Sequence, residues 1–200
     1  MEKTKKKILI ASANAHKIKE IAQILPDYEV LGYKTLADVE IEETGTTFEE
    51  NAVIKAKTVW QTLKIPALAD DSGICVNALG GAPGVYSARY AGDGDDEHNN
   101  DLLLKNLQGE TDRSAKYVCC MAYCSEKGDV LCATGETKGR ILCERVGKNG
   151  FGYDSIFYSE ELDKPMGLAS AAEKNSVSHR ARALKEIITK IKEYEKTGEK

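Results

Sequence analysis

Apolar and polar residues follow two different periods along the first sixty residues. Residues 7–11 (KILIA) contain a short apolar run, residues 8–11, which predicts a buried strand. Over residues 15–25 the apolar positions recur at i, i+3, i+4 and i+7, so we expect a helix with one buried face. Pro26 ends that helix, and residues 28–33 predict a second strand.

A second helical pattern covers residues 48–63. It follows an acidic, glycine-containing loop at residues 40–47. Thr47 and Glu50 have the spacing of a capping box, in which each side chain accepts a hydrogen bond from the backbone of the other. These two residues therefore predict where the helix begins.

The next apolar segment, residues 67–76 (ALADDSGICV), has a strand pattern with two adjacent carboxylates in its middle. Side chains alternate between the faces of a strand, so Asp70 and Asp71 would point in opposite directions. We then expect one to be structural and the other to reach a functional site. A type I turn with a capping aspartate is the alternative for the Asp-Asp-Ser-Gly segment.

The rest of the chain begins with helix-like segments and then becomes rich in strands. We expect a turn-rich loop at 79–84, a helix at 95–107, strands at 115–124 and 129–136 joined by a turn at 125–128, a further strand at 139–144, a loop leading into a strand at 148–158, and a last helix at 178–194. This order predicts a mixed α/β fold in which helices flank a central sheet. No linker is evident, so residues 1–200 are interpreted as one domain, with two lobes and a cleft between them.

Composition narrows the possible functions. The chain has 200 residues, 42% of them hydrophobic and 30% charged, and a net charge of −4, which argues against a protein that coats nucleic-acid polymers. The apolar run after the N-terminal lysines is too short for a signal peptide, and no stretch has the length of a membrane span. We therefore expect a cytoplasmic protein. Its six cysteines form no CxxC pair, which favours reduced, mostly buried thiols over zinc or disulfides.

Two helix N-termini carry cations where the helix dipole favours acids. Asn14 suits the N-cap of the first helix, yet Lys17 lies in its first turn. The last helix begins with Ser178, His179 and Arg180. An anion bound at such a helix end would make these cations favourable, so the pattern indicates phosphate binding. Lysines and arginines that simply point into solvent are the alternative.

Two further segments suggest metal and base binding. Mg²⁺ in nucleotide sites takes one or two protein carboxylates, and Asp71 could be joined by a glutamate of the acidic loop. Residues 150–157 (GFGYDSIF) combine glycines, aromatic rings and an acid, which suits stacking on a planar base and accepting its N–H groups. His179 could donate to a purine carbonyl. An ordinary strand end packed in the core is the alternative for residues 150–157.

Together these segments resemble one family, inosine triphosphate pyrophosphatase, also called noncanonical purine NTP (XTP/dITP) pyrophosphatase. The matching stretches are residues 10–17 (IASANAHK), 43–57 (ETGTTFEENAVIKAK), 69–92 (ADDSGICVNALGGAPGVYSARYAG), 151–157 (FGYDSIF) and 173–184 (EKNSVSHRARAL). The chain departs from the usual pattern at Ala13, Ser155 and Leu168, where Gly, Pro and Glu are common. Ala13 would be strained if its position needs a positive φ.

The resemblance implies an elongated fold that is usually homodimeric. It also implies Mg²⁺-dependent hydrolysis of ITP, dITP and XTP to the monophosphate and pyrophosphate, which clears deaminated purines from the nucleotide pool. Asp71 matches the general base and a metal ligand, and Glu43 matches the second metal ligand. The implied substrate contacts are Ser12, Ala13, Asn14, Ala15, His16, Lys17, Lys55, Ser72, Phe151, Gly152, Tyr153, Asp154, Lys174, His179 and Arg180.

The implied mechanism is attack of water on the α-phosphorus, with Asp71 orienting or deprotonating the water. Lys17, Lys55 and the first helix N-terminus would stabilise charge on the triphosphate. Two alternatives remain open: a pyrophosphatase for other modified nucleotides, and a nucleotide sensor without turnover.

Overall fold

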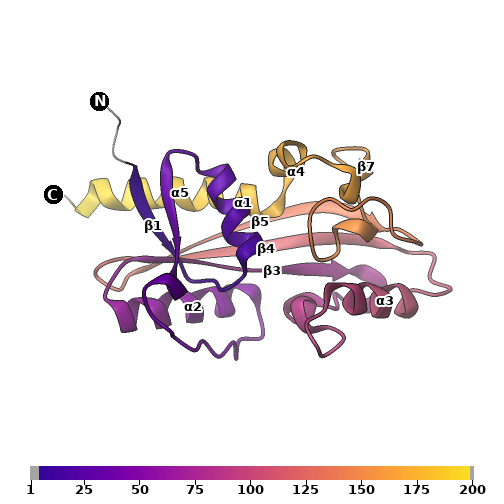
Figure 1. The fold of residues 1–200 in the computed structure, drawn as a ribbon, viewed down its shortest axis with the longest axis horizontal. Helices are drawn as coiled ribbons and strands as arrows, with labels where there is room; N and C mark the ends of the chain where they lie inside the picture. Colours follow the sequence, from indigo (N-terminus) through magenta and orange to yellow (C-terminus); the bar gives the residue numbers. More distant parts are fainter. Residues whose placement is uncertain (1–4, 199–200) are drawn as a thin grey trace. The chain divides into compact units, whose positions relative to one another are not determined.

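The computed structural model describes residues 5–198 and contains a seven-stranded mixed sheet (Figure 1). The strands are β1 (Lys6–Ile10), β2 (Tyr28–Gly32), β3 (Ala67–Val76), β4 (Ser114–Cys124), β5 (Val130–Ile141), β6 (Phe157–Ser159) and β7 (Lys164–Pro165), in the order β2-β1-β3-β4-β5-β6-β7. β1 pairs in parallel with β2 and β3, whereas β6 pairs antiparallel with β5 and β7. The predicted mixed sheet is confirmed.

Five α-helices accompany the sheet in the described part of the chain. They are α1 (Ala15–Ile24), α2 (Phe48–Leu63), α3 (Asp96–Asn106), α4 (Ala171–Val177) and α5 (His179–Gly198). The short 3-10 helices are η1 (Tyr33–Thr35), η2 (Asn77–Leu79), η3 (Gly84–Arg89), η4 (Asp154–Ile156) and η5 (Met166–Leu168). The predicted starts of α1 and α2 are confirmed at their caps. The Asn14 side chain accepts from the amides of His16 and Lys17, and Thr47 and Glu50 form the capping box.

The chain divides into two compact units. Unit 1 contains the described parts of 1–71, 120–134 and 181–200, and unit 2 contains 72–119 and 135–180. Each unit has its own apolar core. That of unit 1 gathers residues such as Leu9, Ala56 and Ala69, and that of unit 2 residues such as Ile74 and Phe157. The interpretation as a single domain, and the cleft between lobes, stay predictions.

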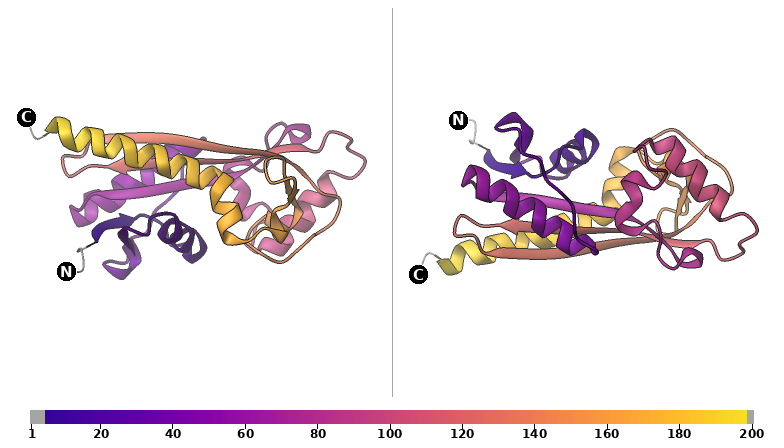
Figure 2. Two further views of the ribbon diagram at one scale, coloured as in Figure 1. Left: turned by 90° about the horizontal axis from the view of Figure 1, so that it is seen from above. Right: turned by 90° about the horizontal axis from the view of Figure 1, so that it is seen from below.

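In unit 1, helices cover both sides of the strands. α1 and α2 lie on opposite sides of β1 and β3 (Figures 1 and 2). The α2 side carries the core: Ala52, Ala56 and Val59 of α2 pack in one cluster with Ala67 and Ala69 of β3. The odd-numbered residues at the start of β3 therefore face α2, as the alternation of side chains requires.

The structure corrects the strand boundaries that were predicted between residues 129 and 144. The strands expected at 129–136 and 139–144 are one strand, β5. Gly139, where the second of these strands was expected to begin, lies near the C-terminal end of β5. A Cβ at that position would lie 2.1 Å from the backbone oxygen of Tyr158 on β6, so the close strand approach explains the glycine.

The helix α4 was missed, and the last helix begins one residue later than expected. Ser170 and Glu173 form a capping box at the start of α4, a signal that is visible in the sequence. Ser178 has an extended backbone (φ −68°, ψ 146°), which separates α4 from α5. Lys174 therefore lies within α4.

Two further expectations can be compared with the described residues. No helix among residues 5–198 is long and apolar enough to cross a membrane. All six cysteines are free thiols; Cys119, Cys120 and Cys124 are buried, and Cys143 is exposed. Cys75 and Cys132 are intermediate in exposure, so three of the six thiols are buried, and their reduced state stays a prediction.

Candidate active site

The two adjacent carboxylates lie within one continuous strand. β3 runs without a break from Ala67 to Val76, so the turn considered for this segment does not form. Asp70 is fully buried and Asp71 is 6% exposed. Their side chains point to opposite faces, and each meets a lysine from a different helix. The prediction that alternation separates the pair is confirmed.

Asp71 lies on the side of β3 that faces α2. The Lys55 ammonium is 2.7 Å from Oδ1 of Asp71 and 3.2 Å from Oε1 of Glu43, which lies in the loop before α2. The amide of Asn51, one turn before Lys55, donates to Oδ2 of Asp71 over 3.4 Å. Unit 1 thus brings together Glu43, Lys55 and Asp71, three residues that the family resemblance selected.

Burial and charge have different effects on the two partners of this pair. Burial raises the pKa of Asp71, and the nearby Lys55 ammonium opposes that rise only in part. Burial acts to lower the pKa of Lys55, but the carboxylates of Asp71, Asp70 and Glu43 together raise it above its ordinary value. Lys55 therefore stays charged, while Asp71 takes up a proton more readily than an exposed aspartate.

Asp70 meets the lysine of the first helix. The ammonium of Lys17, whose side chain is 15% exposed, lies 3.2 Å from Oδ1 of Asp70. The first turn of α1 contains no acidic residue, as the sequence indicated. The backbone amides of His16 and Lys17 already donate to the Asn14 side chain. An anion at this helix end would therefore interact mainly with the charge of Lys17 and with the exposed turn before the helix.

The other residues selected near this helix end lie in the turn before α1 or in its first turn. Ser12 is buried, and its Oγ accepts from the amide of Asn14. Ala13, Ala15 and His16 are exposed. Among the described residues, Lys64 and Asp163 are the non-glycine positions with positive φ, so Ala13 does not carry the strain considered for it.

A second cluster lies in unit 2, around the loop from Phe151 to Asp154. The Asp154 carboxylate accepts from the amide of Phe151 and forms a buried ion pair with Lys174. The Lys174 ammonium also lies 4.6 Å from the centre of the Phe151 ring. Gly150 allows this tight loop, since its φ is +81° and a Cβ there would lie 2.0 Å from Oδ2 of Asp154.

Helix α3 and η3 hold the same loop from other sides. Asn100 donates to the backbone oxygen of Gly152, and Asp96 accepts from the amide of Gly152. The Tyr153 ring is buried, and its hydroxyl donates to the backbone oxygen of Ser87. The predicted residues 151–154 thus form one ordered segment, with Tyr153 directed into the core rather than outward.

The last motif supplies two buried side chains. His179, 5% exposed, stacks on Tyr117 with ring centroids 4.7 Å apart and planes 9° apart. Arg180, 1% exposed, donates to the hydroxyl of Ser72 over 2.9 Å. Its guanidinium lies 5.8 Å from the centre of the Phe151 ring. Unit 2 thus gathers Ser72, Phe151 and the two basic residues.

Three residues that contact the candidate site residues were not selected from the sequence. Asn51 is a polar residue on the buried face of α2, one turn from Lys55, and that spacing was a usable signal. The role of Tyr117 depends on which strand lies beside α5, which no local pattern gives. Asp70 was expected to be structural, but its partner Lys17 was not identified.

The residues around Lys55 suit a hard divalent cation in their chemistry. Glu43 and Asp71 offer carboxylate oxygens that converge on one ammonium group, so a positive charge is already accommodated between them. Within residues 5–198 no group of three or more His, Cys, Asp or Glu side chains could hold a metal. Two protein carboxylates match what Mg²⁺ needs when phosphate oxygens and water complete its coordination.

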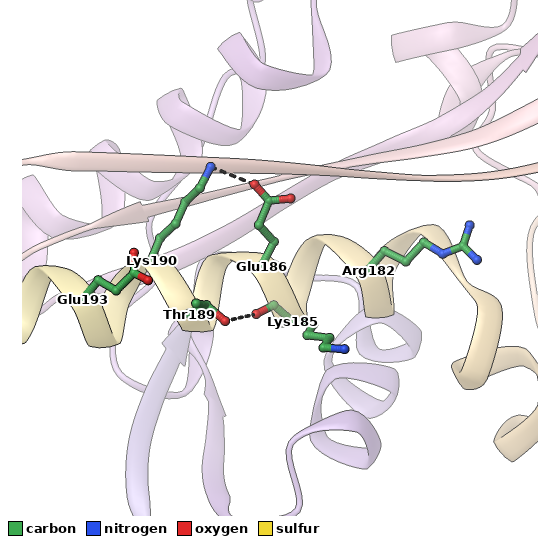
Figure 3. A pocket seen from close by; sticks show the side chains of 6 residues that line it. All are labelled: Arg182, Lys185, Glu186, Thr189, Lys190 and Glu193. Carbon is green, nitrogen blue, oxygen red and sulfur yellow. Dashed lines mark hydrogen bonds and ion pairs between the residues drawn. The ribbon is translucent and has the colours of Figure 1, made fainter.

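A surface hollow of about 430 Å³ lies elsewhere, along α5 (Figure 3). Its lining residues are Arg182, Lys185, Glu186, Thr189, Lys190 and Glu193. Lys190 pairs with Glu186 over 2.9 Å, and none of the residues selected from the sequence lines this hollow. It is therefore separate from the candidate site.

Comparison with known proteins extends over both units. Residues 8–190 match the model of the Ham1 family. A protein named dITP/XTP pyrophosphatase from Lactiplantibacillus plantarum is 46% identical over 193 residues, which cover 94% of this chain and 95% of that protein. One of the same name from Listeria monocytogenes is 48% identical over 188 residues, 90% of this chain and 92% of that protein. The solved structure of the Staphylococcus aureus Ham1 protein has a TM-score of 0.85 at 43% identity and covers 98% of this chain and 100% of that one.

Proposed function

Because the chain belongs to the Ham1 family, it is a pyrophosphatase of noncanonical purine nucleoside triphosphates, and we propose how its own residues divide the reaction. The substrates are ITP, dITP and XTP, and the products are the nucleoside monophosphate and pyrophosphate. The observation that carries this assignment is the pair of buried lysine–carboxylate contacts on successive residues of β3.

The triphosphate binds in unit 1. Lys17 and Lys55 each lie beside a carboxylate in a buried setting, where a charge interacts more strongly than it does in water. Both ammonium groups can turn from these contacts toward phosphate oxygens. They stabilise the negative charge that develops on the leaving pyrophosphate.

Asp71 acts on the attacking water. Its carboxylate can take the proton of a water molecule that attacks the α-phosphorus, and in the metal-free protein burial raises its pKa above that of an exposed aspartate. The bond from the α-phosphorus to the bridging oxygen breaks, and pyrophosphate leaves. Glu43 and Asp71 would hold Mg²⁺, which would supply further neutralisation of the phosphate charge.

The purine binds in unit 2. Phe151 offers an aromatic face, and the side chains of His179 and Arg180 carry N–H donors for a 6-oxo group. Adenine has an amino group at that position and would leave a buried donor opposed by another donor. Such mismatches are strongly rejected.

The setting of the enzyme follows from the same family resemblance. We propose that residues 1–200 act as one domain with two lobes, that the protein is cytoplasmic, and that it forms a homodimer. It needs no nucleic-acid polymer and no membrane as partner. It clears deaminated purines before a polymerase can use them.

A substrate panel tests the assignment. Pyrophosphate release is measured from ITP, XTP, dITP, dUTP, a methylated NTP and ATP, each with Mg²⁺ and with a chelator. We expect release from the first three only, and only with the metal. Preference for dUTP or the methylated nucleotide would instead favour a pyrophosphatase for other modified nucleotides, and no release from any would favour a sensor.

A further inference from the structure

Asn51 occupies an unusual position for an asparagine in a helix. It is fully buried on α2, one turn before Lys55 and on the same side of the helix. A buried amide is costly unless its polar atoms are paired. Both ends of the Asn51 amide make hydrogen bonds, and they reach two different segments of unit 1.

The oxygen end holds the acidic loop. Oδ1 of Asn51 accepts from the backbone amide of Gly45 over 2.8 Å, two residues after Glu43. Gly45 is packed so tightly that a Cβ there would lie 2.6 Å from this oxygen and 2.9 Å from the Asn51 backbone nitrogen. The loop can therefore approach α2 this closely only with glycine at that position.

The nitrogen end holds the catalytic carboxylate. Nδ2 of Asn51 donates to Oδ2 of Asp71, while Lys55 donates to Oδ1 of the same group. Lys55 also contacts Glu43, so two side chains of α2 connect the acidic loop with Asp71. The connection through Lys55 is cationic, and the connection through Asn51 is neutral.

The two connections respond differently to a divalent cation. A dication held by Glu43 and Asp71 would repel the Lys55 ammonium, which lies 3.2 Å and 2.7 Å from these two carboxylates, because like charges in a buried site interact strongly. The neutral amide of Asn51 is not repelled in this way. Its hydrogen bonds can persist in both states and keep the loop and the carboxylate in register.

We propose that Asn51 is a positioning residue that sets the distance and orientation of Glu43 relative to Asp71, and thereby the affinity of this site for Mg²⁺. The inference rests on the proposed function, in which these two carboxylates are the metal ligands. Groups that orient ligands in this way affect metal affinity or activity by roughly 10- to 100-fold when they are removed.

The test compares Asn51→Ala with the wild-type protein. Titration calorimetry measures the binding of Mg²⁺ and Mn²⁺ to the full chain without nucleotide. The Mg²⁺ concentration at half-maximal pyrophosphate release is measured separately. We expect both to weaken by at least about 10-fold, with kcat partly restored at saturating Mg²⁺ and the KM for ITP changed less than the metal midpoint.

Two further variants make the result decisive. Gly45→Ala perturbs the same contact from the loop side and should weaken metal binding in the same direction, even if Asn51→Ala fails to fold. Asn106→Ala removes an exposed helical asparagine that bonds to Tyr90, and it should leave metal binding unchanged. Metal affinity within 2-fold of the wild-type value in a folded Asn51→Ala or Gly45→Ala protein overturns the inference, including when the melting temperature falls.

The calorimetric measurement also separates this inference from the proposed function. If the wild-type protein binds the metal but releases no pyrophosphate from any nucleotide, the proposed function fails, whereas the comparison of metal affinities still decides the role of Asn51.

Discussion

Replacing Lys55 with methionine removes the cation that lies among three carboxylates. Lys55 is 6% exposed, contacts Asp71 and Glu43 directly, and is also influenced by Asp70. Methionine fills a similar volume, so little packing is lost. The main effect of the substitution is therefore electrostatic: buried carboxylates are left without their positive partner.

The magnitude follows from the burial of the pair. Removing one partner of a buried ion pair typically costs about 3–5 kcal/mol. We expect about 3 kcal/mol for Lys55→Met at pH 7, a large part of the roughly 5–15 kcal/mol that stabilises a typical domain. Burial already raises the pKa of Asp71 above 3.8, and without Lys55 it rises further. A folded-state carboxyl with a raised pKa binds its proton more tightly than the unfolded chain does, so the loss of stability shrinks as the pH falls from 7 toward 3.8.

Urea unfolding at pH 7 and pH 5 measures this effect. Trp60 is the single tryptophan of the chain and lies on α2 in unit 1, so its fluorescence reports on the same unit. Lys57→Met, at an exposed position of the same helix, is the matched control and should change stability by no more than about 0.5 kcal/mol. A cost below about 1 kcal/mol for Lys55→Met, or a cost that does not shrink at pH 5, would refute the reasoning.

Three further substitutions test other parts of the structure. An ion pair with Lys164 lowers the pKa of Glu173 to about 2, so Glu173→Gln should destabilise the protein at pH 7, with a deficit that disappears as the pH falls from about 4.5 toward 2; a deficit of the same size at pH 2.5 in chemical unfolding would contradict this. Gly139→Ala places a methyl group 2.1 Å from the Tyr158 backbone oxygen and should cost about 2 kcal/mol or more in thermal unfolding, whereas a wild-type melting temperature would show that β5 and β6 adjust freely. His179→Ala should lower kcat/KM for ITP at least about 10-fold more than for ATP; equal losses for both substrates would exclude His179 from base discrimination.

Local sequence patterns were sufficient to predict features that depend on residues close together in the chain, such as helix starts and the alternation of side chains along a strand. The helical period and the cap residues Asn14 and Thr47 placed α1 and α2, because a cap satisfies backbone groups within three residues of itself. Alternation along β3 was enough to separate Asp70 from Asp71. The strand β5 was wrongly divided into two strands. The close approach of β6 that requires a glycine at position 139 comes from a strand about twenty residues away in the chain, so the local sequence does not reveal it.

The candidate site depends more on contacts between distant segments. Pattern alone offered five glutamates as partners of Asp71, three in the acidic loop and two in the first turn of α2, and the family resemblance selected Glu43. The structure brings Glu43 and Asp71 to one lysine. The stacking of Tyr117 on His179 joins a strand to the last helix, and nothing in either segment's own sequence indicates that pairing.

The central claim is that Asp71 performs the chemistry while other groups bind the nucleotide. Asp71→Asn keeps the size and shape of the side chain and removes its charge and its ability to accept a proton. Pyrophosphate release from ITP at saturating Mg²⁺ and the equilibrium binding of ITP are measured on the same preparation. We expect turnover to fall at least about 100-fold while ITP still binds; turnover close to that of the wild-type protein would show that Asp71 is not the base.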